Sequence, residues 1–185
     1  SPEEMALALM LERDGHGVLY LPFLNYSQGS LEPIRAMMES RATLPGLSDG
    51  GAHVGMICDG SFTTTMLTHW ARDRQRGPKL PIEYLVKRQT QDTAQWMGLH
   101  DRGVIAPGYR ADLNVIDLAN LKLHLPEVQY DLPAGGRRLM QRASGYTATI
   151  LKGEVTHRDG DPTGAKPGRM VRGAQTLQTA AIAAE

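Results

Sequence analysis

The feature that most constrains this chain is a change in its hydrophobic pattern near residue 100. Before that point, short apolar runs at 18–21 and 44–48 alternate with segments of helical periodicity at 31–38, 61–74 and 81–97. Strands that alternate with helices over short links are typical of parallel α/β units. Beyond residue 100 the helical period fades, and short apolar segments between Gly and Pro turns indicate strands.

Particular residues mark the ends of these predicted helices and strands. Pro2, followed by Glu3 and Glu4, is typical of a helix N-terminus, and this helix should end near Asp14-Gly15. In the second part, strands are predicted at 111–117, 146–151 and 154–157, with the turn Lys152-Gly153 between the last two. We expect three parts: residues 1–100 (α/β), 101–172 (mostly β) and 173–185 (a terminal helix or tail).

Composition excludes several classes of protein. The chain has 20 basic and 20 acidic residues and therefore no net charge, which argues against nucleic-acid and polybasic membrane-surface partners. No apolar run is long enough to span a membrane, and the acidic first fifteen residues are unlike a signal peptide. Cys58 is the single cysteine, which excludes an internal disulfide and fits a cytoplasmic location.

The densest group of chemically useful residues is the segment from Ser48 to His53, directly after the second apolar run. A carboxylate such as Asp49, at the C-terminal end of a parallel strand, points to the place where barrel enzymes assemble active sites. Gly50 and Gly51 allow a sharp turn and a close approach of ligand. The alternative is an Asp-Gly turn without chemistry, with His53 as a structural hydrogen-bonding residue.

Other motifs are weak or absent. No two of the six histidines lie two, three or four residues apart, so the chain has no H-x-H or H-E-x-x-H zinc motif. The glycines at 50, 51 and 55 are not followed by the Lys-Ser/Thr of a phosphate-binding loop. Arg137, Arg138 and Arg142 form a small basic cluster that we interpret as a solvated face.

Taken together, several motifs resemble the D-aminoacylase (N-acyl-D-amino-acid deacylase) group of the amidohydrolase superfamily. The segment 47–53 is similar to the last barrel strand of these enzymes, and 90–94 to the helix that follows the barrel. The segment 103–113 resembles the return to their β-sandwich, 152–155 a hairpin of that sandwich, and 163–169 their C-terminal tail. The motifs occur in the expected order along nearly the whole chain.

The resemblance implies a fold class and a chemistry. The chain would be α/β, with the last βα units of a TIM-like metal-dependent hydrolase barrel followed by a mostly β sandwich segment. Asp49 would act as general base and acid in hydrolysis of an amide, and His53, Gly50 and Gly51 would contact the substrate. The implied cofactor is zinc, as one or two divalent ions, with Asp49 as a candidate ligand and most ligands outside this chain.

The departures from the family pattern limit these expectations. The strands that carry the other metal ligands are not in this sequence, and no arginine lies between Asp49 and Arg72 to hold a substrate carboxylate. The sequence therefore predicts amide hydrolysis in preference to specificity for D-amino acids. We expect the chain to be the C-terminal portion of a longer enzyme, inactive alone, that packs against the missing part of the barrel or self-associates. The alternatives are a non-catalytic binding or interaction module, and a superfamily member that acts on cyclic amides or by deamination.

Overall fold

The structure, a computed structural model, describes residues 1–19, 25–26, 28–46, 53–56 and 59–176. The chain divides into two compact units, which are described separately. The first comprises 1–43, 47–60 and 124–142, and the second comprises 44–46, 61–123 and the residues from 143 onward.

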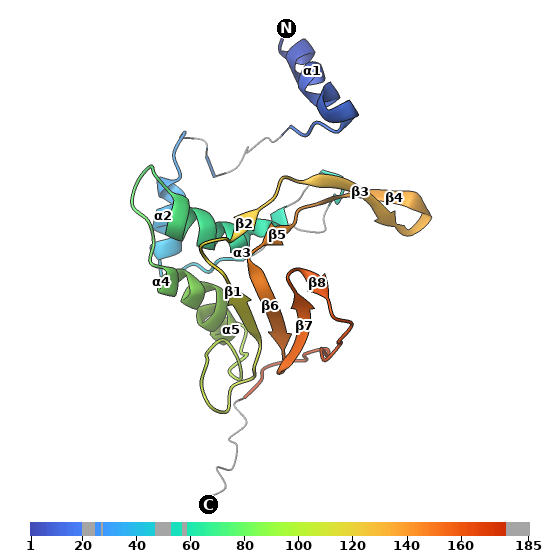
Figure 1. The fold of residues 1–185 in the computed structure, drawn as a ribbon. Helices are drawn as coiled ribbons and strands as arrows, with labels where there is room; N and C mark the ends of the chain where they lie inside the picture. Colours follow the sequence, from blue (N-terminus) through green and yellow to red (C-terminus); the bar gives the residue numbers. More distant parts are fainter. Residues whose placement is uncertain (20–24, 27, 47–52, 57–58, 177–185) are drawn as a thin grey trace, which may run out of the picture. The chain divides into compact units, whose positions relative to one another are not determined.

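Apart from the short η4, the helical elements precede the strands along the described chain (Figure 1). The helical elements are α1 (Pro2–Gly15), α2 (Glu32–Glu39), η1 (Asp59–Ser61), α3 (Phe62–Thr65), η2 (Met66–Asp73), α4 (Ile82–Lys87), η3 (Arg88–Asp92), α5 (Thr93–Trp96) and η4 (Pro133–Gly135). The strands are β1 (Leu113–Ile116), β2 (Lys122–Leu123), β3 (Glu127–Leu132), β4 (Gly136–Met140), β5 (Ala143–Ser144), β6 (Tyr146–Leu151), β7 (Glu154–Arg158) and β8 (Asp161–Pro162).

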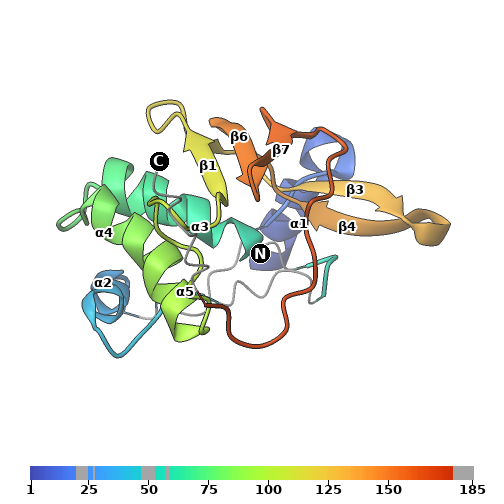
Figure 2. The ribbon, with the colours of Figure 1, turned by 90° about the horizontal axis from the view of Figure 1, so that it is seen from below.

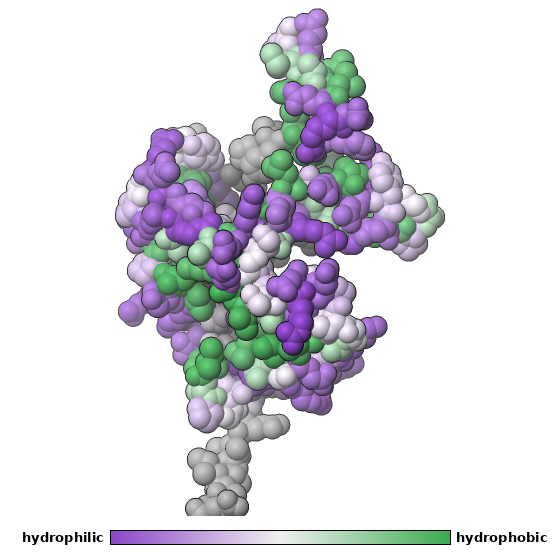
Figure 3. All heavy atoms as spheres, viewed as in Figure 1, coloured by the Kyte–Doolittle hydropathy of each residue, from purple (hydrophilic) through white to green (hydrophobic). Residues whose placement is uncertain are grey.

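In the first unit, α1 begins and ends where the sequence predicts. The Ser1 hydroxyl accepts a hydrogen bond from the Glu4 amide (3.3 Å), and the helical dihedrals are lost over residues 12–14. Met5, Leu7, Met10 and Leu11 are each more than half exposed, and Figure 3 shows this apolar surface over α1 in green. The helix therefore presents apolar side chains that no described residue covers.

The rest of the first unit includes α2 and an antiparallel hairpin. Arg35 of α2 makes ion pairs with Glu32 (3.1 Å) and Glu39 (2.5 Å), one turn away on either side. Strands β3 and β4 form a two-stranded ribbon in which Val128 lies opposite Leu139 (Figure 1). The ribbon is closed by the short helix η4.

The helices of the second unit bury most of the apolar core. Leu85 of α4 is fully buried, and Met66, Leu67 and Trp70 of η2 are each at most 6% exposed. The segments η2 and η3 are π-helices, and η3 joins α4 to α5, which Figure 2 shows running along one line. The predicted helices at 61–74 and 81–97 are confirmed.

The sheet of the second unit is antiparallel, with strand order β1-β6-β7-β8. The turn between β6 and β7 has positive φ at both central residues, Lys152 (54°) and Gly153 (82°). Turns with this geometry match the right-handed twist of the flanking strands, which is why they close two-residue hairpins. The predicted hairpin at 146–157 is therefore confirmed.

The parallel strands predicted before residue 100 do not appear among the described residues. Residues 18–19 and 44–46 are described and lie in no strand, whereas 20–21 and 47–48 lie outside the described residues. A strand needs a neighbouring strand as hydrogen-bonding partner, and the described residues before 99 supply none. The mixed α and β character and the change from helices to strands are confirmed. The barrel-end and sandwich arrangement, and the three-part division at 100 and 172, remain predictions.

The predicted terminal helix or tail at 173–185 falls almost wholly outside the described residues. Its described start pairs with the segment that follows α5, because the Gln175 amide donates to the Gly98 carbonyl oxygen and the Gln175 carbonyl oxygen accepts from the His100 amide. Within the described part of the chain, no helix combines the length and apolar character that crossing a membrane requires.

Candidate functional site

Of the four predicted site residues, the structure describes one. Asp49, Gly50 and Gly51 lie outside the described residues, and His53 begins the described segment 53–56. The roles assigned to all four remain predictions.

His53 starts a tight turn with unusual backbone geometry. Its φ is +46°, in the left-handed region that residues other than glycine rarely adopt, although histidine does so more often than most. Its carbonyl oxygen accepts a hydrogen bond from the Met56 amide (2.7 Å), and its side chain is exposed. Such backbone conformations occur disproportionately at binding and catalytic sites. The exposed imidazole is accessible to a ligand.

The turn is attached to the β3–β4 ribbon by a backbone hydrogen bond. The Leu139 amide of β4 donates to the Val54 carbonyl oxygen (2.7 Å). Val54 and Leu139 are separated by more than eighty positions in sequence, so this contact could not be anticipated from the sequence. The hydrogen bond places the segment that follows the predicted catalytic aspartate at the edge of β4.

The ribbon carries several charged side chains. Arg138 of β4 makes two hydrogen bonds to the Asp131 carboxylate of β3 (2.7 and 2.6 Å). The Arg138 guanidinium lowers the pKa of Asp131, and the charge of Arg142 adds to this effect. Arg137 is exposed and makes no hydrogen bond or ion pair with the residues that the structure describes. Arg138 thus faces a carboxylate, whereas the exposed Arg137 and Arg142 form no ion pair with a described residue.

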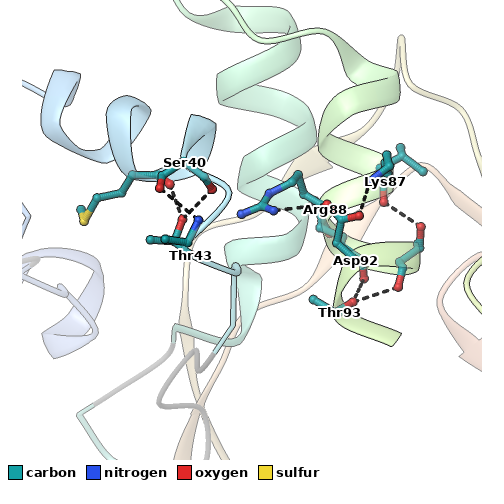
Figure 4. A network of polar contacts seen from close by, with 11 residues as sticks. Ser40, Thr43, Lys87, Arg88, Asp92 and Thr93 are labelled. Carbon is teal, nitrogen blue, oxygen red and sulfur yellow. Dashed lines mark hydrogen bonds and ion pairs between the residues drawn. The ribbon is translucent and has the colours of Figure 1, made fainter. Parts of the chain in front are cut away.

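The segment 87–93, which includes most of the family-like helix motif, forms a polar network of its own (Figure 4). Asp92 receives a hydrogen bond from Lys87 and an ion pair from the buried Arg88 (3.2 Å). The Lys87 ammonium lowers the pKa of Asp92, and Arg88 lowers it further. Thr93 donates to the Gln89 and Thr90 carbonyl oxygens (2.9 and 3.0 Å). These contacts stabilise the helix, and they leave Asp92 ionised.

A second group of polar side chains lies at the end of η2. The His69 and Trp70 rings meet edge to face at 5.3 Å, and the Arg74 guanidinium lies 4.3 Å from the centre of the Trp70 ring. The His69 Nε2 atom is buried and has no hydrogen-bond partner among the described residues. Burial lowers the pKa of His69, Arg74 lowers it further, and Asp73 opposes them. His69 is therefore held neutral.

The segment 103–113 owes much of its order to Asp112. One carboxylate oxygen accepts hydrogen bonds from Arg110 Nε and from the Lys152 amide, both at 2.8 Å. The other lies 3.6 Å from an Arg102 nitrogen. Asp112 therefore connects the loop before β1 to the turn between β6 and β7, which is a structural role.

The described residues do not form a metal site. Nowhere in the described ranges do three or more His, Cys, Asp or Glu side chains come together in a way that could hold an ion. We assign no metal ligand among them and derive no catalytic step through a metal. The expected zinc and the candidate ligand Asp49 remain predictions.

Comparison with known proteins gives the family. The model of the Amidohydrolase family matches residues 14–157, which is well over half of the chain. The chain therefore belongs to the Amidohydrolase family, whose members are generally metal-dependent. The match begins before the predicted Asp49 segment and ends within β7.

Individual relatives are similar over shorter stretches. An uncharacterized protein of Mycobacterium tuberculosis is 36% identical over 124 residues, which are 62% of this chain and 20% of that protein. A 5-methylthioadenosine/S-adenosylhomocysteine deaminase of Desulfitobacterium hafniense is 35% identical over 81 residues, 39% of this chain and 19% of the deaminase. A solved D-aminoacylase structure has 30% identity and a TM-score of 0.42, and the match covers 56% of this chain and 19% of that one. The chain spans about a fifth of the length of these proteins.

One feature of the site has no counterpart in the sequence pattern. The attachment of the 53–56 turn to β4 is a backbone hydrogen bond, which does not depend on which side chains are present. The solvated face predicted for the basic cluster agrees with the exposure of Arg137 and Arg142, and Arg138 is bound to Asp131.

Proposed function

We propose that the protein hydrolyses a non-peptide C–N bond of a small molecule, namely the amide of an N-acyl amino acid. The observation that carries this proposal is the match of the Amidohydrolase family over residues 14–157. The N-acyl amino acid is supported by the resemblance of segments 47–53, 103–113 and 163–169 to the D-aminoacylase group. Zinc with most of its ligands outside this chain belongs to the same proposal.

In this reaction Asp49 moves the proton. Its carboxylate accepts a proton from the attacking water and donates it to the leaving nitrogen, so that amide and water become a carboxylic acid and a free amine. His53 contacts the substrate from the turn that follows, together with Gly50 and Gly51. The support for His53 is its exposed side chain and its left-handed backbone.

A second candidate is deamination of an amino-substituted ring, with release of ammonia. It is favoured by the 35% identity to a deaminase, although this covers only 39% of the chain. Both reactions break a C–N bond by addition of water, so they differ in substrate and leaving group.

A substrate panel separates the candidates. The full-length protein that contains this chain is assayed with N-acetyl-D- and N-acetyl-L-amino acids, a hydantoin as cyclic amide, and 5-methylthioadenosine. We expect release of free amino acid from at least one N-acetyl amino acid. If ammonia release from methylthioadenosine is the one reaction observed, the proposal is replaced by deamination. If ring opening of the hydantoin is the one reaction observed, it is replaced by cyclic-amide hydrolysis. Turnover of none of them would favour a non-catalytic binding module.

A further inference from the structure

The turn at 53–56, which begins with the predicted substrate-binding residue His53, is not held by side-chain packing. All four of its residues are exposed, and Met56 is 75% exposed. A Cβ added at Gly55 would meet nothing within 4 Å. Inside the turn, the Met56 amide donates a hydrogen bond to the His53 carbonyl oxygen (2.7 Å). The position of the turn therefore depends on how its backbone is attached.

One hydrogen bond attaches the turn to the rest of the described first unit. The Leu139 amide of β4 donates to the Val54 carbonyl oxygen (2.7 Å), and no other hydrogen bond or ion pair joins 53–56 to the described residues outside the turn. His53 has a φ of +46°, and a residue other than glycine keeps this conformation only where the surrounding structure holds it. The hydrogen bond to Val54, the next residue in the chain, is the described contact that can do so.

The place of Leu139 in the β3–β4 ladder leaves its amide available for this bond. Facing residues of an antiparallel pair alternate between those that exchange hydrogen bonds and those that do not. Leu139 lies opposite Val128 of β3, and its amide donates to Val54 instead, so this pair is of the second kind. The pairs on either side carry the hydrogen bonds of the ladder. The ribbon therefore does not use the Leu139 amide itself.

The backbone that presents this amide is fixed at the neighbouring residue. Arg138 makes two parallel hydrogen bonds to the Asp131 carboxylate of β3 (2.7 and 2.6 Å). A two-point contact of this kind sets the orientation of both groups. The Leu139 amide is thus presented by a strand that the ladder and an ion pair both hold to β3.

We propose that the Leu139 backbone amide positions the substrate-binding turn. Through Val54 it fixes the backbone of His53, and with it the place from which the imidazole contacts the substrate. This inference rests on the proposed function. Leu139 acts through His53, so it is a positioning residue with no part in proton transfer, and its loss should weaken substrate binding without changing the chemical step.

Proline at position 139 removes the amide N–H and leaves the ladder intact, because this N–H does not bond to β3. The full-length protein and L139P are assayed with N-acetylmethionine, in the enantiomer that is hydrolysed. We expect KM to rise about 3- to 10-fold with kcat unchanged, as for loss of one hydrogen bond. The Met56 amide should exchange with deuterated solvent faster by a similar factor. Replacement of Leu139 by its α-hydroxy acid analogue, which keeps the side chain and has oxygen in place of N–H, should give the same results and serves as the test if L139P does not fold.

V128P is the matched control, since the Val128 amide lies on the outer edge of β3 and has no acceptor among the described residues. We expect V128P to have the KM and the Met56 exchange rate of the wild type. A double-mutant cycle with His53→Ala separates positioning from a general loss of stability, because L139P should raise KM no further once the His53 side chain is absent. Additive losses in the cycle, a fall in kcat alone, an unchanged KM, or the same change in V128P would overturn the proposal.

The exchange measurement needs no substrate, so it distinguishes the two proposals. A wild type that hydrolyses no N-acyl amino acid overturns the proposed function and the role of Leu139 in substrate binding. Unchanged Met56 exchange in an L139P variant of an active enzyme overturns the positioning role alone.

Discussion

Replacing Asp112 by alanine should destabilise the second unit by about 3 kcal/mol. Asp112 accepts hydrogen bonds from Arg110 Nε and the Lys152 amide, each at 2.8 Å, and its side chain is 22% exposed. A hydrogen bond that involves a charged group contributes about 1.5–3 kcal/mol. The 3.6 Å approach of Arg102 is a partly exposed ion pair, which adds at most about 1 kcal/mol. Asp112→Asn keeps one acceptor oxygen and should lose about half as much as Asp112→Ala.

Thermal and urea unfolding of the purified variants measure this effect. For a chain of this size, about 3 kcal/mol corresponds to a fall in Tm of about 6–12 °C. Amide hydrogen exchange gives a local readout, because the Lys152 amide should exchange faster once its acceptor is removed. Asp161→Ala is the control, since Asp161 is exposed on β8, and its cost should stay within about 0.5 kcal/mol. If Asp112→Ala unfolds at the same temperature as Asp161→Ala, the structural role of Asp112 is refuted.

Two further predictions concern stability. The pKa of His69 is lowered by burial and then by Arg74, so the unfolded chain binds a proton at higher pH than the folded chain. Stability should therefore decrease as the pH falls through about 6.5 towards the folded pKa, and His69→Gln should weaken this dependence in urea titrations at pH 7.5 and 5.5. An equal change of unfolding free energy between the two pH values in the wild type and in His69→Gln would contradict this prediction. Gly145 and Gly153 both have positive φ, but a Cβ at Gly145 would lie 2.6 Å from Leu121 Cα, whereas a Cβ at Gly153 meets nothing within 4 Å. Gly145→Ala should cost about 2–5 kcal/mol and Gly153→Ala about 1–2 kcal/mol, and similar Tm values for the two would argue against the crowding at Gly145.

Local elements of this fold could be predicted because their signals lie close together in sequence. The turn at Lys152-Gly153 needs positive φ at two adjacent positions, and the helical period over 81–97 repeats within one helical run. The parallel strands expected before residue 100 depend on partner strands, and the described residues contain none there. An apolar run with the pattern of a buried strand forms a strand only where a partner strand is present to hydrogen-bond with it.

The sequence predicts which types of residue the candidate site contains, but it predicts only part of their spatial arrangement. Segment 103–113 was recognised as a motif, but its function as a connection to Lys152 depends on a contact across forty positions. Arg137 and Arg138 are adjacent in sequence and look equivalent there. The strand places them on opposite faces, and Asp131 neutralises Arg138.

The most direct test of the central claim, that Asp49 transfers the proton during C–N bond hydrolysis, is the activity and metal content of Asp49→Asn in the full-length protein. Asparagine keeps the size of the side chain and cannot act as a base, so kcat on the N-acetyl amino acid should fall about 10²- to 10⁴-fold. Metal content, measured by elemental analysis, should equal that of the wild type. A variant that retains the wild-type rate would contradict the role assigned to Asp49.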